Sequence, residues 1–411
     1  MSQHPSFHTD RSSVSVPMAP TTTMITVGCG PVIFPFSAEV ISVLTAIMLV
    51  AIVIDALRMD LARQLIPAPL PALAIAFLLC LAGLSTIWSI DPARSLDRTV
   101  KLAPIALCAA VALSPAARMI LAPHRARILR VMAWGCGVGA ALAAADMLAG
   151  YPIQALGRDL FGGDDVKTSF YNRGLTFILM LSLPAIAWLV AMSQPRLAIA
   201  LTAVVILAAA LSVNNVMKLG LITGAIVALA AWRTPKLTAY TLAGGTTLLA
   251  FLQPVLYYQI ADRIAYFEWQ RHSIYNRIEI WDYVALAAIR KPLTGWGLDV
   301  TRYLPTFHER VDAYDIVSRL YMHGHNNFLE IWSNIGVLGV AAAVALVWMA
   351  INGIRRLDHT AIRAFLLAGL AIVILVAFVS FGAWQTSWLA ALVLVTVIYR
   401  LCADYAPSSA S

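Results

Sequence analysis

The chain has 411 residues, of which 60% are hydrophobic and only 12% are charged. Soluble globular proteins carry about 25% charged residues, so this composition excludes an ordinary soluble protein and predicts a membrane protein. The net charge of +8 is typical of membrane proteins that gather Lys and Arg in cytoplasmic loops, and we expect no nucleic-acid partner. The five cysteines show no metal-like spacing, so we expect them to be small packing residues.

The N-terminal segment is polar and contains Ser, Thr and Pro. It lacks the apolar core and cleavage site that mark a signal peptide, so we expect a disordered tail over residues 1–23. Residues 24–36 are apolar but form a short stretch that holds two glycines and two prolines. This stretch is interpreted either as a re-entrant piece or as a twelfth membrane span.

Apolar runs of nearly 20 residues recur from residue 37 to residue 402. A membrane helix needs about 20 such residues, and in lipid the backbone must satisfy its own hydrogen bonds, which favours helices. The sequence predicts an all-α, polytopic membrane helix bundle of about 11–12 transmembrane helices, with one large loop containing short helices. The predicted spans are 37–55, 70–89, 99–116, 131–150, 173–192, 197–213, 217–232, 237–255, 327–352, 361–382 and 385–402.

These spans divide the chain into a first transmembrane part (24–256), a large loop (257–325), the last three helices (326–403) and a C-terminal tail (404–411). One set of alternate loops holds thirteen Lys and Arg residues, whereas the opposite short loops hold seven. The richer set is cytoplasmic by the positive-inside rule. The large loop is therefore predicted to face outward, into the periplasm, from a multi-pass protein of the bacterial inner membrane.

The loop at 257–325 is charged, contains four of the eight histidines, and is rich in aromatic residues. A loop this long is usually functional or disordered, and the aromatic residues favour order. Residues 273–290 are predicted to form a helix, on which Arg277 and Trp281 share a face because they are four residues apart. A tight turn is expected at 295–297, where two glycines flank a tryptophan.

The loop ends in the run His323, Gly324, His325, Asn326 and Asn327, directly before an apolar helix. Histidine suits proton transfer near neutral pH, so His325 is a candidate base, while His323 is equally consistent with interfacial anchoring. Two histidines at this spacing lack a third ligand at any standard spacing, so we expect no metal.

The start of the following helix carries a polar stripe. Asn326 or Asn327 is expected to cap the helix. Asn326, Glu330 and Asn334 are four residues apart and share one face, and Gly336 allows close packing. Ionisable groups at the mouth of a membrane helix are costly and usually functional.

Four further polar segments lie at the outward edges of the predicted spans. They are residues 88–101, 171–174, 214–218 and 380–388. Tryptophans at such edges are more often interface anchors than site residues. Arg173 and Lys218 are more informative, because cations on the outer side oppose the positive-inside trend and suit an anionic ligand such as phosphate.

The chain resembles the superfamily of O-antigen ligases and polysaccharide polymerases of the bacterial envelope. The segments that carry the resemblance are 273–281, 292–297, 323–332 with Gly336, 88–92 and 171–174. The family often has Glu where this chain has Asn334. The resemblance covers most of the chain from about residue 75 to residue 390.

The resemblance implies a transfer of glycan from an undecaprenyl-diphosphate carrier to a sugar hydroxyl, either on the lipid A core or on a growing polysaccharide. The ligases of the family are thought to need no metal, and no cofactor is expected. His325 matches the family histidine that would act as base, while Arg277 and Arg173 match arginines that would hold the diphosphate. We include Lys218, His323, Asn326, Trp281 and Glu330 as candidate substrate contacts, with membrane lipids as further partners.

Three alternatives remain open from the sequence. A polysaccharide polymerase of the same superfamily would use the same chemistry. A transporter or flippase for a lipid-linked sugar should place ionisable residues at mid-membrane, whereas Glu39, Asp146 and Lys218 lie near predicted span ends. A non-catalytic scaffold gives no reason for an outer loop rich in His and Arg.

Overall fold

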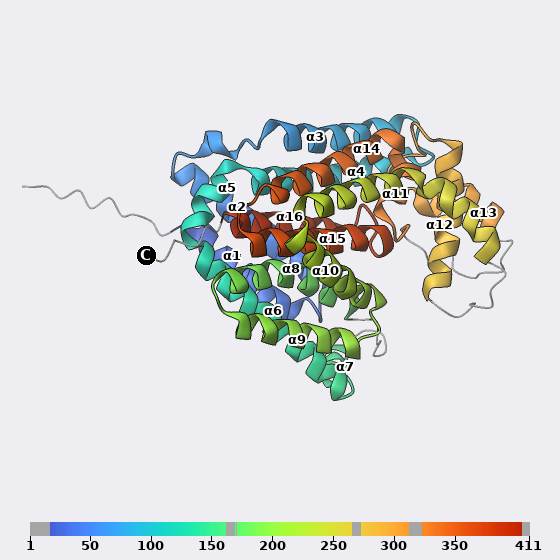
Figure 1. Ribbon diagram of the computed structural model, residues 1–411. Helices are drawn as coiled ribbons and strands as arrows, with labels where there is room; N and C mark the ends of the chain where they lie inside the picture. The colour runs from blue at the N-terminus through green and yellow to red at the C-terminus, as the bar shows by residue number, and fades with distance from the viewer. Residues whose placement is uncertain (1–16, 162–168, 170, 265–272, 312–322, 405–411) are drawn as a thin grey trace, which may run out of the picture.

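The computed structural model describes residues 17–161, 169, 171–264, 273–311 and 323–404, and within these ranges it is all-α (Figure 1). The helices are α1 (Met18–Ile33), α2 (Val40–Arg58), α3 (Pro69–Leu84), α4 (Pro92–Leu113), α5 (Pro115–Leu121), α6 (Arg125–Leu148), α7 (Pro152–Phe161), α8 (Asn172–Ala191), α9 (Pro195–Leu211), α10 (Asn215–Arg233), α11 (Pro235–Ile264), α12 (Ser273–Arg290), α13 (Thr306–Val311), α14 (Asn327–Arg355), α15 (Thr360–Val379) and α16 (Thr386–Ala403). Four short 3-10 turns connect some of them: η1 (Ala62–Leu65), η2 (Ser85–Ile87), η3 (Ala122–His124) and η4 (Thr301–Tyr303).

The predicted polytopic bundle is confirmed. In the described part of the chain, nine helical segments are long and apolar enough to cross a membrane. Helix α9 is apolar but shorter, α1 has 16 residues, and α4 begins with a charged stretch. Together with the nine segments, α1, α4 and α9 give twelve helices, which is the upper end of the predicted number of spans.

Helix α1 corrects the expected N-terminal boundary, because it begins at Met18, inside the segment predicted to be a disordered tail. The threonine hydroxyls of α1 donate hydrogen bonds within the helix, as Thr23 does to the carbonyl of Ala19 at 2.7 Å. The backbone N–H of Ala19 donates to the Asp55 carboxylate of α2 at 2.7 Å, which fixes the start of α1. Polar composition therefore did not prevent a helix here, and residues 1–16 lie outside the described part.

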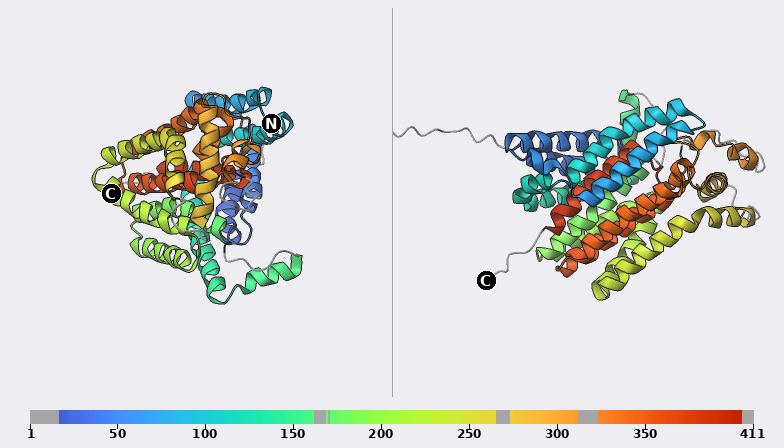
Figure 2. Two further views of the ribbon diagram at one scale, coloured as in Figure 1. Left: turned by 90° about the vertical axis from the view of Figure 1, so that its right-hand side faces the viewer. Right: turned by 90° about the horizontal axis from the view of Figure 1, so that it is seen from above.

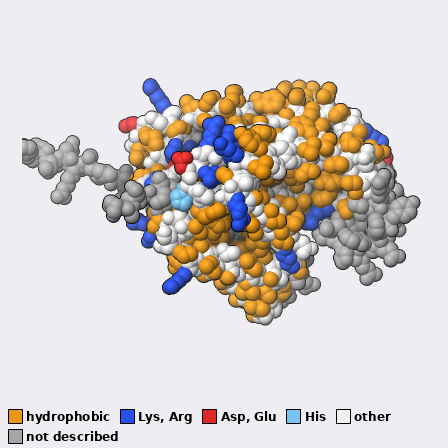
Figure 3. Space-filling model, in the orientation of Figure 1, with side chains coloured by type: hydrophobic (Ala, Val, Ile, Leu, Met, Phe, Trp, Pro, Cys, Tyr) orange, Lys and Arg blue, Asp and Glu red, His pale blue; other side chains and the backbone are white. Residues whose placement is uncertain are grey.

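Helix α8 forms the centre of the bundle. Of the most apolar stretch of α8, 89% is buried, whereas for α3 the share is 11%. Helices α6, α9, α10, α15 and α16 pack around α8, and α3 lies at the periphery (Figure 2). Figure 3 shows hydrophobic side chains over much of the visible face, with many of the visible Lys and Arg toward the end where the chain's C-terminus leaves.

Helices α12 and α13 lie together beyond one end of the bundle, which we call the loop end (Figure 1). The helix predicted at 273–290 is confirmed as α12. It has a small apolar core of its own, in which Ile280, Val284, Val300 and Leu304 are buried together with Leu329 of α14. The large loop is thus ordered where it is described, and its residues 265–272 and 312–322 lie outside that part.

Candidate active site

Helix α14 is interrupted near its start. Gly336 has φ 75° and ψ −172°, which is not a helical conformation. The carbonyls of Ser333 and Asn334 instead accept hydrogen bonds from the backbone N–H groups of Trp296 (2.8 Å) and Gly297 (3.0 Å). In return, the N–H of Val337 donates to the carbonyl of Pro292 at 2.8 Å. The turn at 295–297 thereby replaces the hydrogen bonds that the helix gives up.

Glycine is required on both sides of this contact. A Cβ on Gly336 would collide with the carbonyl of Leu293, and a Cβ on Gly295 would collide with the backbone of Asn334. Both glycines also have positive φ, which other residues rarely adopt. Gly336 was expected to allow helix packing, but its role here is to break the helix so that the turn can dock.

The segment at 88–101 is fastened to the same turn. The indole N–H of Trp88 donates to the carbonyl of Thr294 at 2.9 Å, so this tryptophan holds the turn as well as standing at a span edge. Arg94 and Arg98 both pair with the carboxylate of Asp299, at 3.0 Å and 2.9 Å. Segments that are far apart in the sequence are therefore brought together at the loop end.

The polar stripe on α14 is confirmed, and each member is buried. The side-chain oxygen of Asn326 accepts from the N–H of Leu329, which confirms the predicted cap, and its amide donates to Gln253 at 2.9 Å. Asn334 accepts from the N–H of Asp299 at 2.7 Å and from the indole of Trp384 at 2.9 Å. Asn326 and Asn334 thus serve to join α14 to its neighbours.

Glu330, the third member, supports the loop between α15 and α16. Its carboxylate accepts from the N–H of Ala383 at 2.8 Å and from the hydroxyl of Thr301 at 3.2 Å. Only 1% of Glu330 is exposed, and its described partners do not include His325. The carboxylate therefore holds the segment that faces His323.

His325 is held by a backbone carbonyl. Its Nδ1 lies 2.8 Å from the carbonyl oxygen of Ser380. A carbonyl only accepts hydrogen bonds, so Nδ1 carries the proton and Nε2 keeps its lone pair. The backbone of His325 has φ 49°, an unusual conformation for a residue other than glycine. This tautomer leaves Nε2 as the ring nitrogen that can accept a proton.

His323 packs against His325, with the ring centroids 4.1 Å apart. Its Nδ1 accepts a long hydrogen bond of 3.4 Å from the backbone N–H of His325. Gly382 faces His323 so closely that a Cβ there would lie 2.6 Å from the Cβ of His323. The two imidazoles and the loop at 380–385 therefore form one unit.

Helix α12 presents Trp281 and Arg277 to this unit. The indole N–H of Trp281 donates to the carbonyl of Gly324, between the two histidines, at 3.0 Å. Arg277, one turn earlier, is half-buried, and burial lowers the pKa of its guanidinium. The predicted shared face of Arg277 and Trp281 is thus the face that meets the histidine run.

Arg173 reaches the site from the start of α8. Gly174 lets α8 approach the end of α1, because a Cβ at this position would collide with the carbonyl of Phe34. Tyr171 is buried directly before the helix, and its hydroxyl donates to the carboxylate of Asp146. Arg173 itself is half-exposed and pairs with Glu39 at 3.3 Å.

Lys218 lies one turn into α10, beside the start of α8. The amide of Asn214 donates to the carbonyl of Asn172 at 2.7 Å and to the hydroxyl of Thr176 at 3.0 Å, which ties the two helix starts together. Lys218 is half-buried, and its ammonium makes no ion pair with a described residue. The structure thus places Lys218 in the neighbourhood of Arg173 without a direct contact to the histidines.

The charges of the two arginines reach the histidines. Burial is the main reason why the pKa of His325 falls to about 4, and the charges of Arg277 and Arg173 lower it further. Burial likewise lowers the pKa of His323 to about 3, with the charges of His325 and Arg173 contributing. Both imidazoles are therefore neutral at pH 7, and the nearby charges of Arg173 and Arg277 favour an anionic ligand.

Within the described ranges, no group of three or more His, Cys, Asp or Glu residues is arranged to hold a metal ion. Sequence reasoning missed the contribution of the loop at 380–385. The sequence indicates only polar residues and tryptophans in that loop, whereas the atom that contacts His325 is the backbone carbonyl of Ser380, which has no residue-type signature.

Fold and site together define a polytopic membrane protein that gathers two histidines and two arginines at one end of its helix bundle. Residues 171–344 match the family model described as O-antigen ligase. Proteins named "Putative polysaccharide ligase" are similar: one from Rickettsia conorii is 27% identical over 247 residues, covering 57% of this chain and 59% of that protein. One from Rickettsia felis is 26% identical over 238 residues, covering 56% and 58%.

These matches support an O-antigen ligase-like superfamily for this chain, as the motifs of the loop and of α14 predicted. The chain spans less than two thirds of the length of the curated relatives that it matches. The matched region contains Arg173, Lys218, Arg277 and the complete histidine run.

Proposed function

We propose that the protein is a glycosyl transferase that moves a glycan from an undecaprenyl-diphosphate carrier to a sugar hydroxyl at the periplasmic face of the inner membrane. The acceptor in this proposal is the lipid A core. The observation that carries the proposal is the meeting of a neutral His325, whose Nε2 keeps its lone pair, and two arginines whose charges act on it. A base for the acceptor and cations for the leaving group are what this transfer needs.

In the proposed reaction, Nε2 of His325 accepts the proton of the acceptor hydroxyl while that oxygen attacks the anomeric carbon of the donor sugar. The bond between the anomeric carbon and the diphosphate oxygen breaks, and its electron pair leaves with the diphosphate. Arg277 and Arg173 stabilise the departing charge, a role in which fixed donors in a water-poor site are most effective. The proton on His325 then passes to solvent or to the released diphosphate.

Bound diphosphate also improves the base. The positive charges of Arg277 and Arg173 depress the pKa of His325, and an anion placed between them offsets part of that effect. His325 therefore becomes a stronger base once the donor occupies the site. This order couples donor binding to activation of the acceptor hydroxyl.

The test is a transfer assay with purified protein and a diphosphate-linked glycan. We expect His325→Ala to lower the transfer rate by roughly 100- to 10,000-fold, the usual contribution of general base catalysis, whereas His124→Ala at the opposite end of the bundle should act like wild type. On α12 itself, Arg277→Ala should lower transfer by about 100-fold or more. Its matched control is Arg290→Ala, which removes only an exposed pair with Glu309. Full activity in both His325→Ala and Arg277→Ala would end the proposal.

A polysaccharide polymerase would use the same residues on a different acceptor. Supplying the assay with a carrier-linked repeat in place of a lipid A core separates the two, because only the polymerase elongates the repeat. A flippase gains no support from the buried carboxylates, since Asp55 and Asp146 hold the N–H groups of Ala19 and Ile153 near helix ends.

A further inference from the structure

A second region adjoins the histidines through the loop at 380–385. Gly382 faces His323, and the next two residues, Ala383 and Trp384, line a cavity of about 670 Å³. Helices α3, α4, α14, α15 and α16 line this cavity, which is partly open to the outside of the bundle, and its lining is almost entirely apolar. Its chemistry suits the hydrocarbon chains of a lipid.

Helix α4 carries two arginines above this cavity. Arg94, Arg98, Leu102, Ile105 and Ala109 follow one another at helical spacing and therefore share a face. The last three of these line the cavity. The two guanidinium groups stand at the loop-end side of the same face, in the position of a headgroup above its chains.

Hydrogen bonds connect the arginines to the cavity wall. Trp384 donates to Asn334, which also accepts from the N–H of Asp299, whose carboxylate binds Arg94 and Arg98. Two guanidinium groups share one carboxylate, so the cluster keeps a net positive charge. The arginine side chains are 24% and 26% exposed, and each uses Nε and one terminal nitrogen on Asp299. The remaining donors suit a phosphate.

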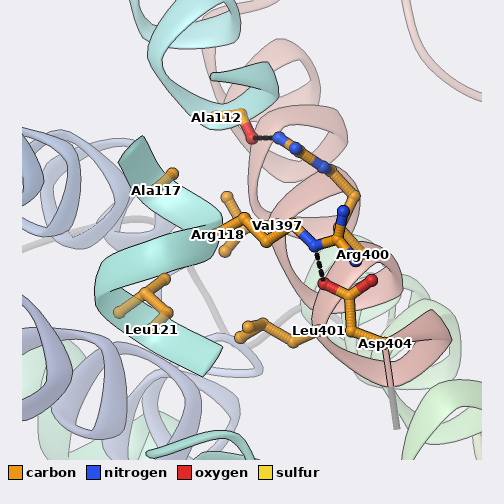
Figure 4. Close-up of a pocket in the computed structure, with 8 residues that line it drawn as sticks. All are labelled: Ala112, Ala117, Arg118, Leu121, Val397, Arg400, Leu401 and Asp404. Carbon is orange, nitrogen blue, oxygen red and sulfur yellow. Dashed lines mark hydrogen bonds and ion pairs between the residues drawn. The ribbon is translucent and has the colours of Figure 1, made fainter. Parts of the chain in front are cut away.

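At the opposite end of the cavity, Ala112 and Arg400 also line a small pocket where α16 meets α4 and α5 (Figure 4). Arg400 donates to the carbonyl of Ala112 at 2.6 Å, and Arg118 pairs with Asp404 at 2.6 Å. Along α4 the cavity extends from Leu102 to Leu113, which is about 16 Å of helix. Along α14 the lining reaches from Asn327 to Ile354, which is about 40 Å of helix. The cavity therefore has room for long hydrocarbon chains that extend away from a headgroup at the loop end.

We propose that this cavity and the pair Arg94–Arg98 form a second lipid site, which binds the phosphate-bearing glycolipid that carries the acceptor. The inference rests on the proposed function, because transfer between two lipid-borne glycans at one face requires two lipid sites. Arg173 and Arg277 serve the donor at the histidines. The acceptor lipid lies in the cavity that Ala383 and Trp384 line, across the loop at 380–385 from the histidines.

The test compares two tryptophan substitutions on α4. Ala106 lines the cavity, whereas Ala103, three residues earlier, is exposed and is not part of the lining. The full chain in detergent micelles is titrated with lipid A or with undecaprenyl diphosphate, and bound lipid is counted by native mass spectrometry. We expect Ala106→Trp to weaken lipid A binding at least tenfold and Ala103→Trp to leave it unchanged. Undecaprenyl diphosphate should bind both variants like wild type and should be lost in Arg277→Ala.

The headgroup contact is tested by Arg98→Gln, which should also weaken lipid A binding at least tenfold, with Arg98→Lys intermediate. Because Arg98→Gln leaves Asp299 with Arg94 alone, Ala106→Trp decides the matter if that variant misfolds. If Ala106→Trp weakens the binding of undecaprenyl diphosphate and leaves lipid A binding intact, the cavity holds the hydrocarbon chain of the donor and the proposal is wrong. If phosphatidylglycerol binds as tightly as lipid A, the cavity holds ordinary membrane lipid and the proposal is wrong. If the wild-type protein shows the expected binding pattern but transfers no glycan, the second lipid site stands and the proposed function is wrong.

Discussion

At the scale of single residues, the site depends on a histidine whose conformation is set by its neighbours. His325 has positive φ, a conformation that costs about 1–3 kcal/mol outside glycine. The carbonyl of Ser380 fixes its ring, and the cap by Asn326 fixes the chain directly after it. The result is an imidazole that keeps the lone pair on Nε2 and has its pKa lowered to about 4.

The lowered pKa predicts the pH dependence of transfer. A histidine with a depressed pKa is neutral above that value, so its action as a base is lost only as pH falls through it. We therefore expect kcat/KM for the donor to stay flat from pH 8 down to about 5 and to fall below that, since the pKa of His325 in the free enzyme is about 4.

The same argument separates kcat from kcat/KM. The bound diphosphate raises the pKa of His325, so the acidic fall of kcat should lie at higher pH than that of kcat/KM. Initial rates across a pH series give both profiles, and a buffer of constant ionic strength keeps screening equal. A fall of kcat/KM centred near 6.5, the ordinary value for histidine, would show that burial does not control this residue.

At the scale of elements, periodicity predicted the helices well. The last three spans, the helix at 273–290 and the stripe on α14 all appear where apolar and polar spacing placed them. The break at Gly336 was missed because a glycine within an apolar run also fits close helix packing. The carbonyl of Ser380 was missed because backbone atoms are present at every residue, and only the fold selects which one faces a histidine.

The break in α14 leads to a stability prediction. Gly336→Ala introduces a Cβ that would collide with the carbonyl of Leu293, at a positive φ that alanine disfavours. We expect a lower Tm, with a loss of at least 1–3 kcal/mol, and lower transfer activity because the turn at 295–297 no longer docks. Thermal unfolding in detergent, followed by fluorescence, measures the change.

Helix α14 also supplies the control. A Cβ added to Gly353 would meet no heavy atom within 4 Å, so Gly353→Ala on the same helix should leave Tm within about a degree of wild type or slightly higher. Equal Tm values for the two variants would mean that the turn does not depend on the break.

At the scale of the whole molecule, the packed centre of the bundle and the candidate site occupy different parts of the fold. The buried α8 and the well-packed α15 and α16 form the centre, while α3 lies at the periphery, with only 11% of its most apolar stretch buried. The site residues come from α8, α12 and the start of α14, all of which meet at the loop end. Charge asymmetry in the sequence predicts, by the positive-inside rule, that this end lies outside the cytoplasm.

The proposed orientation is testable by labelling single cysteines in a chain whose five native cysteines are replaced. Glu309→Cys on α13 lies at the loop end, and Arg356→Cys lies at the far end of α14, and both positions are exposed. In intact cells with a permeable outer membrane, an impermeant maleimide should label the first variant and should leave the second unlabelled until the cells are lysed. The reverse pattern would place the site in the cytoplasm.

The most direct measurement of the central claim is a single-turnover experiment on His325→Ala with saturating acceptor. If His325 is the base and the arginines bind the diphosphate, the donor Kd should stay within about twofold of wild type, while the rate constant for transfer falls by at least 100-fold. Arg277→Ala, measured in parallel, should weaken donor binding as well. A rate constant for His325→Ala within tenfold of wild type would contradict the assignment of His325 as the base.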